Sequence, residues 1–125
     1  MNQRGGCGYA VRTVLQLDPE HVAAKLELGT ILVDTHEPQR AAPLLEEVLR
    51  QRPDDVEARL QHARALAALG QLDLAARELT QCAAHSRSPL PHYHLAAVLE
   101  ALGRTGEAKA ARAEYQRLLR EQAGK

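Results

Sequence analysis

Aromatic side chains are nearly absent from this sequence of 125 residues, which has three Tyr, no Phe and no Trp. Strands favour aromatic and β-branched residues, whereas Leu and Ala are good helix formers. A core built from Leu, Val and Ala therefore suits closely packed helices better than a sheet sandwich. Hydrophobic residues make up 45% of the chain, which is enough for one folded domain.

The chain also lacks an excess of either charge and a long apolar run. Sixteen Lys and Arg balance sixteen Asp and Glu, and this balance argues against a nucleic-acid partner, which normally requires a basic surface. No apolar run reaches the length of about 18 residues that spans a membrane. The first ten residues, MNQRGGCGYA, have no apolar segment typical of a signal peptide. We therefore expect no membrane span and a cytoplasmic location.

Groups for catalysis or metal binding are scarce as well. The two cysteines, Cys7 and Cys82, have no zinc-site spacing, and each is expected to behave as a small apolar residue. None of the six histidines has a histidine partner four residues away, and His92 and His94 point in different directions on a helix. No nucleophile motif or phosphate-binding glycine loop is present. We expect no enzyme activity, no metal and no cofactor.

The chain does contain an internal repeat. Four positions of residues 65–75 recur 33 residues later with the same residue types. The pairs are Leu66 and Leu99, Leu69 and Leu102, Gly70 and Gly103, and Ala75 and Ala108. A looser copy lies about 34 residues earlier. Apolar residues at helical spacing divide each copy into two amphipathic helices.

Glycine, proline and alanine mark the parts of each copy. Gly70 and Gly103 are expected to end the first helix of a pair, and Pro38 to begin a second helix. Small residues recur in two rows, which are expected to let antiparallel helices approach closely. The rows are Gly29, Ala63 and Ala96, and Ala41, Ala75 and Ala108. Because one helical pair cannot bury its own apolar face, the copies are expected to stack.

The pattern Leu28-Gly29-x-x-Leu32, Ala41-x-x-x-Leu45 and Pro53 resembles the tetratricopeptide repeat, and later copies share it. The resemblance covers about residues 9–122. It implies an all-α fold, a right-handed α-solenoid of stacked antiparallel helix hairpins. The expected parts are residues 1–8, disordered or added by cloning; an orphan helix over 9–18, like the second helix of a preceding repeat; repeats at 22–55, 56–88 and 89–122, the last with a polar capping helix; and a tail at 123–125.

The sequence departs from the family pattern at several positions. Lys25, Arg59 and His92 replace the large aromatic residue near the start of each copy, and His62 takes a normally apolar place. Pro43 falls inside an expected helix, where a lost hydrogen bond costs about 3 kcal/mol unless the helix kinks or starts late.

The resemblance implies a function in binding. In that family the first helices line a concave groove that holds a partner segment, and two rows of residues here match the ligand-facing places. They are Leu26, Leu60 and Tyr93, and Thr30, Arg64 and Ala97. Such rows suit an extended or helical peptide with apolar anchors and one acidic group. The alternative is that Leu26 and Leu60 simply pack between neighbouring helices.

Two other functions remain open from the sequence. The orphan helix, at residues 9–17, could drive self-association into a homo-oligomer. The chain could also be a helical accessory arm of a larger enzyme or assembly factor. The primary prediction is a non-catalytic scaffold for a protein or peptide partner whose identity the sequence does not give.

Overall fold

The computed structural model describes residue 17 and residues 21–124, and within these ranges all regular structure is helical. The helices are α2 (Val22–Asp34), α3 (Pro38–Gln51), α4 (Val56–Ala68), α5 (Leu72–Ala84), α6 (Leu90–Ala101) and α7 (Thr105–Ala123). Except for Leu17, the helix expected over residues 9–18 lies outside the described residues. The N-terminal segment 1–8 lies outside them entirely.

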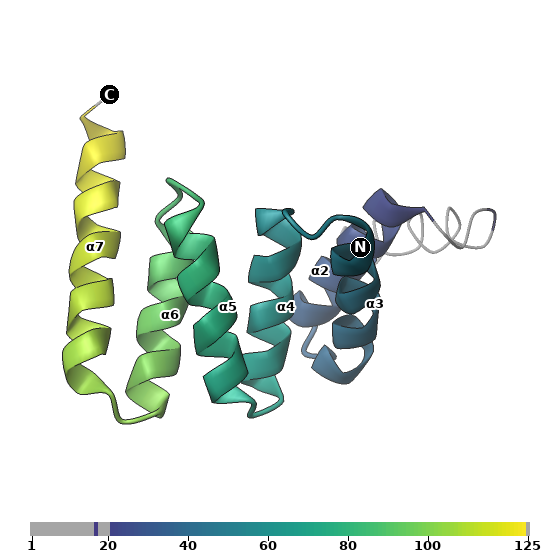
Figure 1. Cartoon of the computed structure of the whole chain (residues 1–125), viewed down its shortest axis with the longest axis horizontal. Coiled ribbons are helices and arrows are strands. Elements are labelled where there is room, and N and C mark those ends of the chain that lie inside the picture. Colours follow the sequence, from purple (N-terminus) through teal and green to yellow (C-terminus); the bar gives the residue numbers. More distant parts are fainter. Residues whose placement is uncertain (1–16, 18–20, 125) are drawn as a thin grey trace, which may run out of the picture.

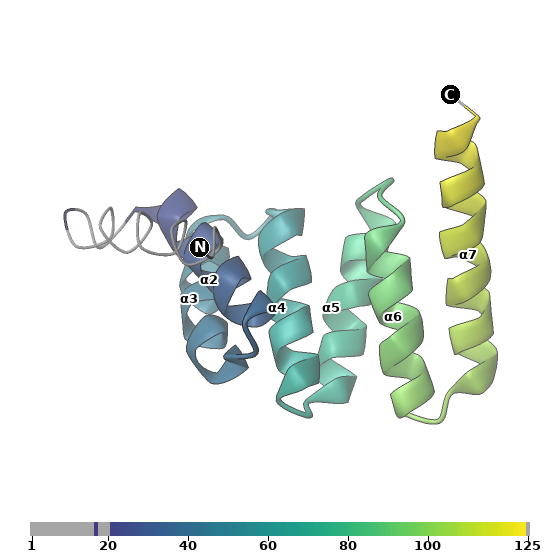
Figure 2. The ribbon, with the colours of Figure 1, turned by 180° about the vertical axis from the view of Figure 1, so that it is seen from behind.

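The helices form three antiparallel hairpins that stack in a row from α2 to α7 (Figure 1). Each helix contacts the next one in the chain, and α4 also contacts α2 and α6. The backbones of α3, α5 and α7 do not contact one another. The layer formed by α2, α4 and α6 is therefore the inner side of the stack, and α3, α5 and α7 form the outer side. The view from behind shows the same order of helices (Figure 2). The predicted all-α solenoid is confirmed.

The turn inside each hairpin has the same backbone conformation. Gly70 and Gly103 have φ values of 87° and 81°, and His36 occupies the equivalent place with φ of 64°. In each turn the next N–H bonds back to the preceding helix, as Gln71 N does to Leu66 O at 2.9 Å. The expectation that Gly70 and Gly103 end helices is confirmed.

Proline and capping residues define other helix ends. Pro38 begins α3, as expected from its fixed φ. Pro43 lies inside the same helix, which starts five residues before it, so the late start that would have accommodated Pro43 does not occur. The Asp55 side chain caps α4 by accepting a hydrogen bond from Ala58 N at 3.0 Å.

The core consists of aliphatic clusters between and within the hairpins. The side chains of Ala41, Ala63 and Ala75 have no exposed surface, so the rows of small residues lie at close helix contacts. At Gly29 the approach is closer still, because a Cβ there would lie 2.8 Å from the Leu45 side chain. Among the described residues, no helix combines the length and hydrophobicity that a bilayer crossing requires.

Candidate functional site

The inner face, which is formed by α2, α4 and α6, carries the six predicted binding residues. At the N-terminal end of the face, two of these residues are already engaged in contacts within the chain. Leu26 is half-buried against the first core cluster. Thr30, also half-buried, donates a hydrogen bond from its hydroxyl to Leu26 O at 2.9 Å. Both predicted residues of α2 therefore have partners within the chain.

Leu60 lies at the centre of the inner layer but is only 4% exposed. It belongs to the second core cluster, together with Ala63, Leu79 and Val98. The packing alternative therefore describes Leu60 well. Its contribution is to support the helices that position the more exposed residues around it.

Arg64 connects the first two hairpins across this face. Its Nη1 donates to Gln61 Oε1 at 2.7 Å, and its Nη2 donates to Asp34 Oδ1 of α2 at 3.2 Å. Gln61 in turn donates to Glu57 Oε1 at 2.9 Å. The side chain of Arg64 remains 27% exposed. A guanidinium has five N–H donors, so donors remain for another acceptor.

The polar partners of Arg64 were not predicted from the sequence. Gln61 precedes Arg64 by one helical turn, and this spacing could have indicated the contact. Asp34 lies 30 residues away in the chain, and only the stacking of α2 against α4 brings the two side chains together. A sequence pattern within one helix could not indicate this pair.

Arg64 is on α4, which packs between α2 and α6, and His94 of α6 is its neighbour on the second side. Burial lowers the pKa of His94, and the positive charge of Arg64 lowers it further. The imidazole is therefore a neutral hydrogen-bonding group near pH 7. The adjacent Tyr93 ring stacks on it, with ring centroids 5.2 Å apart and planes inclined by 5°.

The inner face opens into a hollow of about 450 Å³ at its C-terminal end. The lining residues come from α6 and α7, and they are Tyr93, Ala96, Ala97, Glu100, Arg112, Tyr115 and Gln116. The Tyr93 and Tyr115 rings lie 5.4 Å apart and meet at an angle of 41°. Tyr93 is 48% exposed, and Ala97 is exposed as well. The hollow thus combines an aromatic pair with a small-residue floor.

The hollow is open because no described helix packs on this side of α6 and α7. In the preceding hairpin the equivalent face, at Leu60, Leu79 and Cys82, packs beneath Val98 of α6. At the end of the stack, Arg112 replaces Leu79 and forms an ion pair with Glu100. The polar character expected of the last helix is therefore present on this face.

The six predicted residues separate into three groups. Tyr93 and Ala97 lie together in the hollow. Arg64 does not line it but is close enough to His94, the neighbour of Tyr93, for its charge to lower the pKa of that imidazole. Leu60 is buried beneath. Leu26 and Thr30 lie at the far end of the face, on α2.

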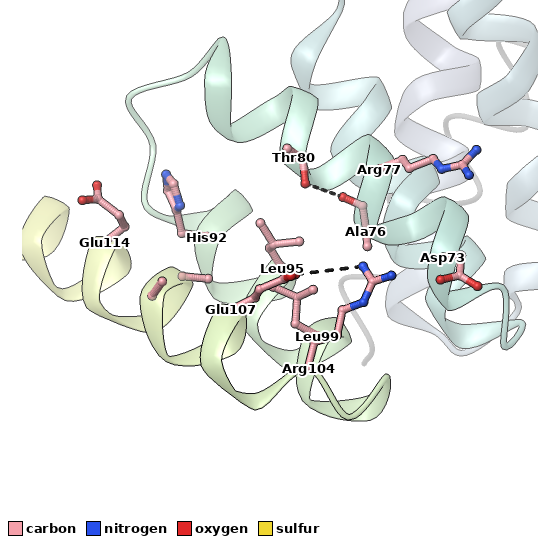
Figure 3. Close-up of a pocket in the computed structure, with 12 residues that line it drawn as sticks. Asp73, Ala76, Arg77, Thr80, His92, Leu95, Leu99, Arg104, Glu107 and Glu114 are labelled. Carbon is pink, nitrogen blue, oxygen red and sulfur yellow. Dashed lines mark hydrogen bonds and ion pairs between the residues drawn. The ribbon is translucent and has the colours of Figure 1, made fainter.

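A second hollow of about 440 Å³ lies on the outer side, between α5 and α7 (Figure 3). Leu95 and Leu99 of α6 form its floor, and Arg104 and Glu107 approach within 4.0 Å at its edge. None of these residues was predicted as a site. Within residues 21–124, no group of three or more His, Cys, Asp or Glu side chains could hold a metal ion.

Comparisons with known proteins agree with this architecture. A family model described as tetratricopeptide repeat matches residues 32–99, more than half of the chain. The structure of MamA 41-end from Desulfovibrio magneticus RS-1 superposes with a TM-score of 0.87 at 21% identity, covering 96% of this chain and 68% of that one. A MamA RS-1 double mutant gives 0.88 at 21% identity, covering 99% and 70%. A further MamA crystal structure gives 0.81 at 22% identity, covering 92% and 68%. No curated protein matches the chain.

Proposed function

The chain belongs to the tetratricopeptide repeat family, and from this premise we propose that it is a non-catalytic scaffold that binds a segment of a partner protein on its inner face. The observation that carries the proposal is the open hollow at the end of that face. Tyr93 and Ala97 line it, whereas the equivalent face of the preceding hairpin is covered by α6. Rigid helical stacks present such surfaces without rearrangement.

The partner segment would place an apolar side chain in the hollow. Half-exposed tyrosines are favourable anchors, because a large ring is desolvated at a small cost in side-chain entropy. The Tyr93 ring contacts both the His94 and the Tyr115 rings, and these contacts order it before binding. Preorganisation of this kind reduces the entropy lost on binding.

The same segment would carry a hydrogen-bond acceptor that reaches Arg64. The guanidinium is oriented by Gln61 and Asp34, and the side chain remains partly exposed. Since Asp34 already balances the charge of Arg64, this contact would mainly set the register of the segment. Affinity would come chiefly from the hollow.

A pull-down from source lysate with quantitative mass spectrometry tests the proposal. The bait is the parent chain, compared with an Ala97→Arg variant that fills the hollow. Ala97 is exposed on a helix, so the variant should keep its fold, and circular dichroism would check this. We expect a partner that is retained by the parent and reduced at least tenfold by Ala97→Arg, followed by the same loss of affinity with the purified partner.

Ala113→Arg provides the matched control. Ala113 is also an exposed alanine within a helix, but it does not line the hollow. It adds the same charge, so a partner lost by both variants would reflect charge alone. A partner held equally by the parent and by Ala97→Arg would contradict the inner-face proposal. Capture of only the chain itself, with a mass that rises with concentration, would favour the self-association alternative through residues 9–17.

A further inference from the structure

A buried histidine joins three helices on the outer side of the stack. The His62 side chain, on α4, is 10% exposed. Its Nδ1 lies 2.7 Å and 2.9 Å from the carboxylate oxygens of Glu78 on α5. Its Nε2 lies 3.7 Å from Glu46 Oε1 on α3 and has no closer hydrogen-bond partner. The imidazole therefore stands between two carboxylates that belong to different hairpins.

The backbones of the two helices that His62 joins do not meet. No backbone contact connects α3 with α5, and each packs separately against α4. Arg59, one turn before His62, lies 3.5 Å from Glu78 and belongs to the same cluster. With His62 protonated, two positive groups balance two carboxylates. With His62 neutral, one negative charge is left over, and a single ring proton cannot serve both carboxylates.

At the next interface between outer helices, the equivalent positions lack these charged residues. By repeat spacing, Leu95 corresponds to His62, Ala111 to Glu78, and Thr80 to Glu46. These three residues line the open outer hollow between α5 and α7 (Figure 3). Among the described helices, the ionic bridge therefore occurs at the α3–α5 interface and not at the α5–α7 interface. The α5–α7 interface serves as an internal comparison.

We propose that protonated His62 is a pH-sensitive tie that holds α3 against α5 and so sets the spacing of the first two hairpins. When the proton leaves, Glu46 loses its attraction to the ring and Glu78 keeps Arg59 as its cation. The outer helices α3 and α5 then move apart, and the stack curves more strongly toward its inner face between the first two hairpins. The inference does not depend on the identity or existence of a partner.

The electrostatic surroundings agree with this assignment. Burial lowers the pKa of His62, but the hydrogen bond and charge of Glu78, together with Glu46, outweigh burial, and the net pKa is raised above its ordinary value of 6.5. The charged groups facing the ring are Glu46 from α3, Arg59 from α4 and Glu78 from α5, with Arg77 at the edge of the same depression. The tie should therefore be closed below pH 6.5 and open as the pH rises through the raised pKa of His62.

Distances between spin labels would test the tie directly. Gln39 on α3 and Asp73 on α5 are exposed, equivalent positions one repeat apart. Labels on cysteines placed there, in a chain with Cys7→Ser and Cys82→Ala, report the spacing of the two outer helices. We expect the distance distribution to shift to longer values as the pH is raised from 5.5 to about 8.5. The imidazole signal of His62 in NMR spectra should titrate over the same range.

Two controls make the result specific. Labels at Asp73 and Gly106 report the next interface, between α5 and α7, where the cluster is replaced by Thr80, Leu95 and Ala111. The distance between labels at Asp73 and Gly106 should not change with pH. In a His62→Leu chain, the distance between labels at Gln39 and Asp73 should not change either. If the Gln39–Asp73 distance of the parent stays constant while His62 titrates, the proposal is overturned. Equal changes at both interfaces, or a change that survives His62→Leu, would overturn it as well.

Discussion

His36 adopts the left-handed backbone conformation that Gly70 holds at the same place one hairpin later, with φ of 64° against 87°. For a residue with a Cβ this conformation costs roughly 1–2 kcal/mol, whereas glycine adopts it freely. The first hairpin therefore contains backbone strain that the second and third avoid.

Replacing His36 with Gly should relieve this strain. We expect His36→Gly to raise the free energy of unfolding by about 1 kcal/mol, as measured by urea denaturation followed by circular dichroism. The matched control is Gly103→Ala, at the equivalent turn with φ of 81°, which should lower stability by a similar amount. An unchanged or lowered stability for His36→Gly would show that the His36 side chain contributes more than its backbone strain costs.

Adding a methyl group at Gly29 should destabilise the first hairpin. Its Cβ would lie 2.8 Å from two atoms of Leu45, a side chain with no exposed surface. Overpacking of this kind costs about 1–3 kcal/mol and exceeds the gain in helix propensity of about 1 kcal/mol. We expect Gly29→Ala to shift the urea midpoint downward. In a Leu45→Ala background, which removes both obstructing carbons, the penalty should shrink; an equal penalty in both backgrounds would place its origin elsewhere.

The close helix contact in the second hairpin should not tolerate a charge. Ala75 has no exposed surface, so Ala75→Glu would bury a carboxylate without a partner. We expect a loss of about 3 kcal/mol or more, with loss of helical circular dichroism at 37 °C. Ala113→Glu, on the exposed surface of α7, should melt within a few degrees of the parent. Similar melting of both variants would mean that the assigned contact is wrong.

Cys82 should be protected from thiol reagents in the folded chain. It is 1% exposed, and burial raises the pKa of its thiol from 9.0 to about 11. At pH 8 the thiolate fraction is then lower by about 100-fold, since two pKa units separate the two states. In a Cys7→Ser chain, labelling with a disulfide reagent should be slow in buffer and rapid in urea. Rapid labelling under native conditions would indicate frequent opening of the α4–α5 hairpin.

The contribution of His62 to stability should depend on pH. Because the pKa of His62 is raised in the folded chain, its stabilising effect is complete below the unfolded value near 6.5 and is lost as pH rises through the folded value. The difference in unfolding free energy between the parent and His62→Leu should therefore shift in favour of the variant with rising pH. A His85→Gln variant, at an exposed position, is the control. A difference that is independent of pH would contradict the raised pKa.

The repeat spacing was sufficient to predict the helices and their turns, because glycine and small residues at fixed offsets reflect local backbone geometry. The resemblance to the tetratricopeptide repeat implied that Tyr93 and Ala97 belong to a first helix of a pair, and both lie on α6 of the inner layer. It could not distinguish exposed from covered positions along one row: Leu60 and Tyr93 are equivalent by spacing, yet Leu60 is buried and Tyr93 is half-exposed. Exposure depends on whether another helix packs above, which only the stacked structure reveals.

Contacts between hairpins could not be predicted from the sequence for a similar reason. His62 was recognised as a polar residue at an apolar place, but its partners Glu46 and Glu78 lie on different helices on either side of it. The pairing of Arg64 with Asp34 likewise depends on the angle at which α4 packs on α2. Repeat periodicity specifies positions within a unit, whereas these ion pairs depend on the relation between units.

Because aromatic residues are so few, the pairing of Tyr93 with Tyr115 has a practical use. The chain has no Trp and only three Tyr, so these two rings supply most of its near-ultraviolet absorption and emission. They lie 5.4 Å apart in the same hollow. A segment entering there would displace water from both rings and change their emission. The unlabelled protein thus contains its own optical probe at this position, and a fluorescence titration with a peptide free of tyrosine and tryptophan would report occupancy without any added dye.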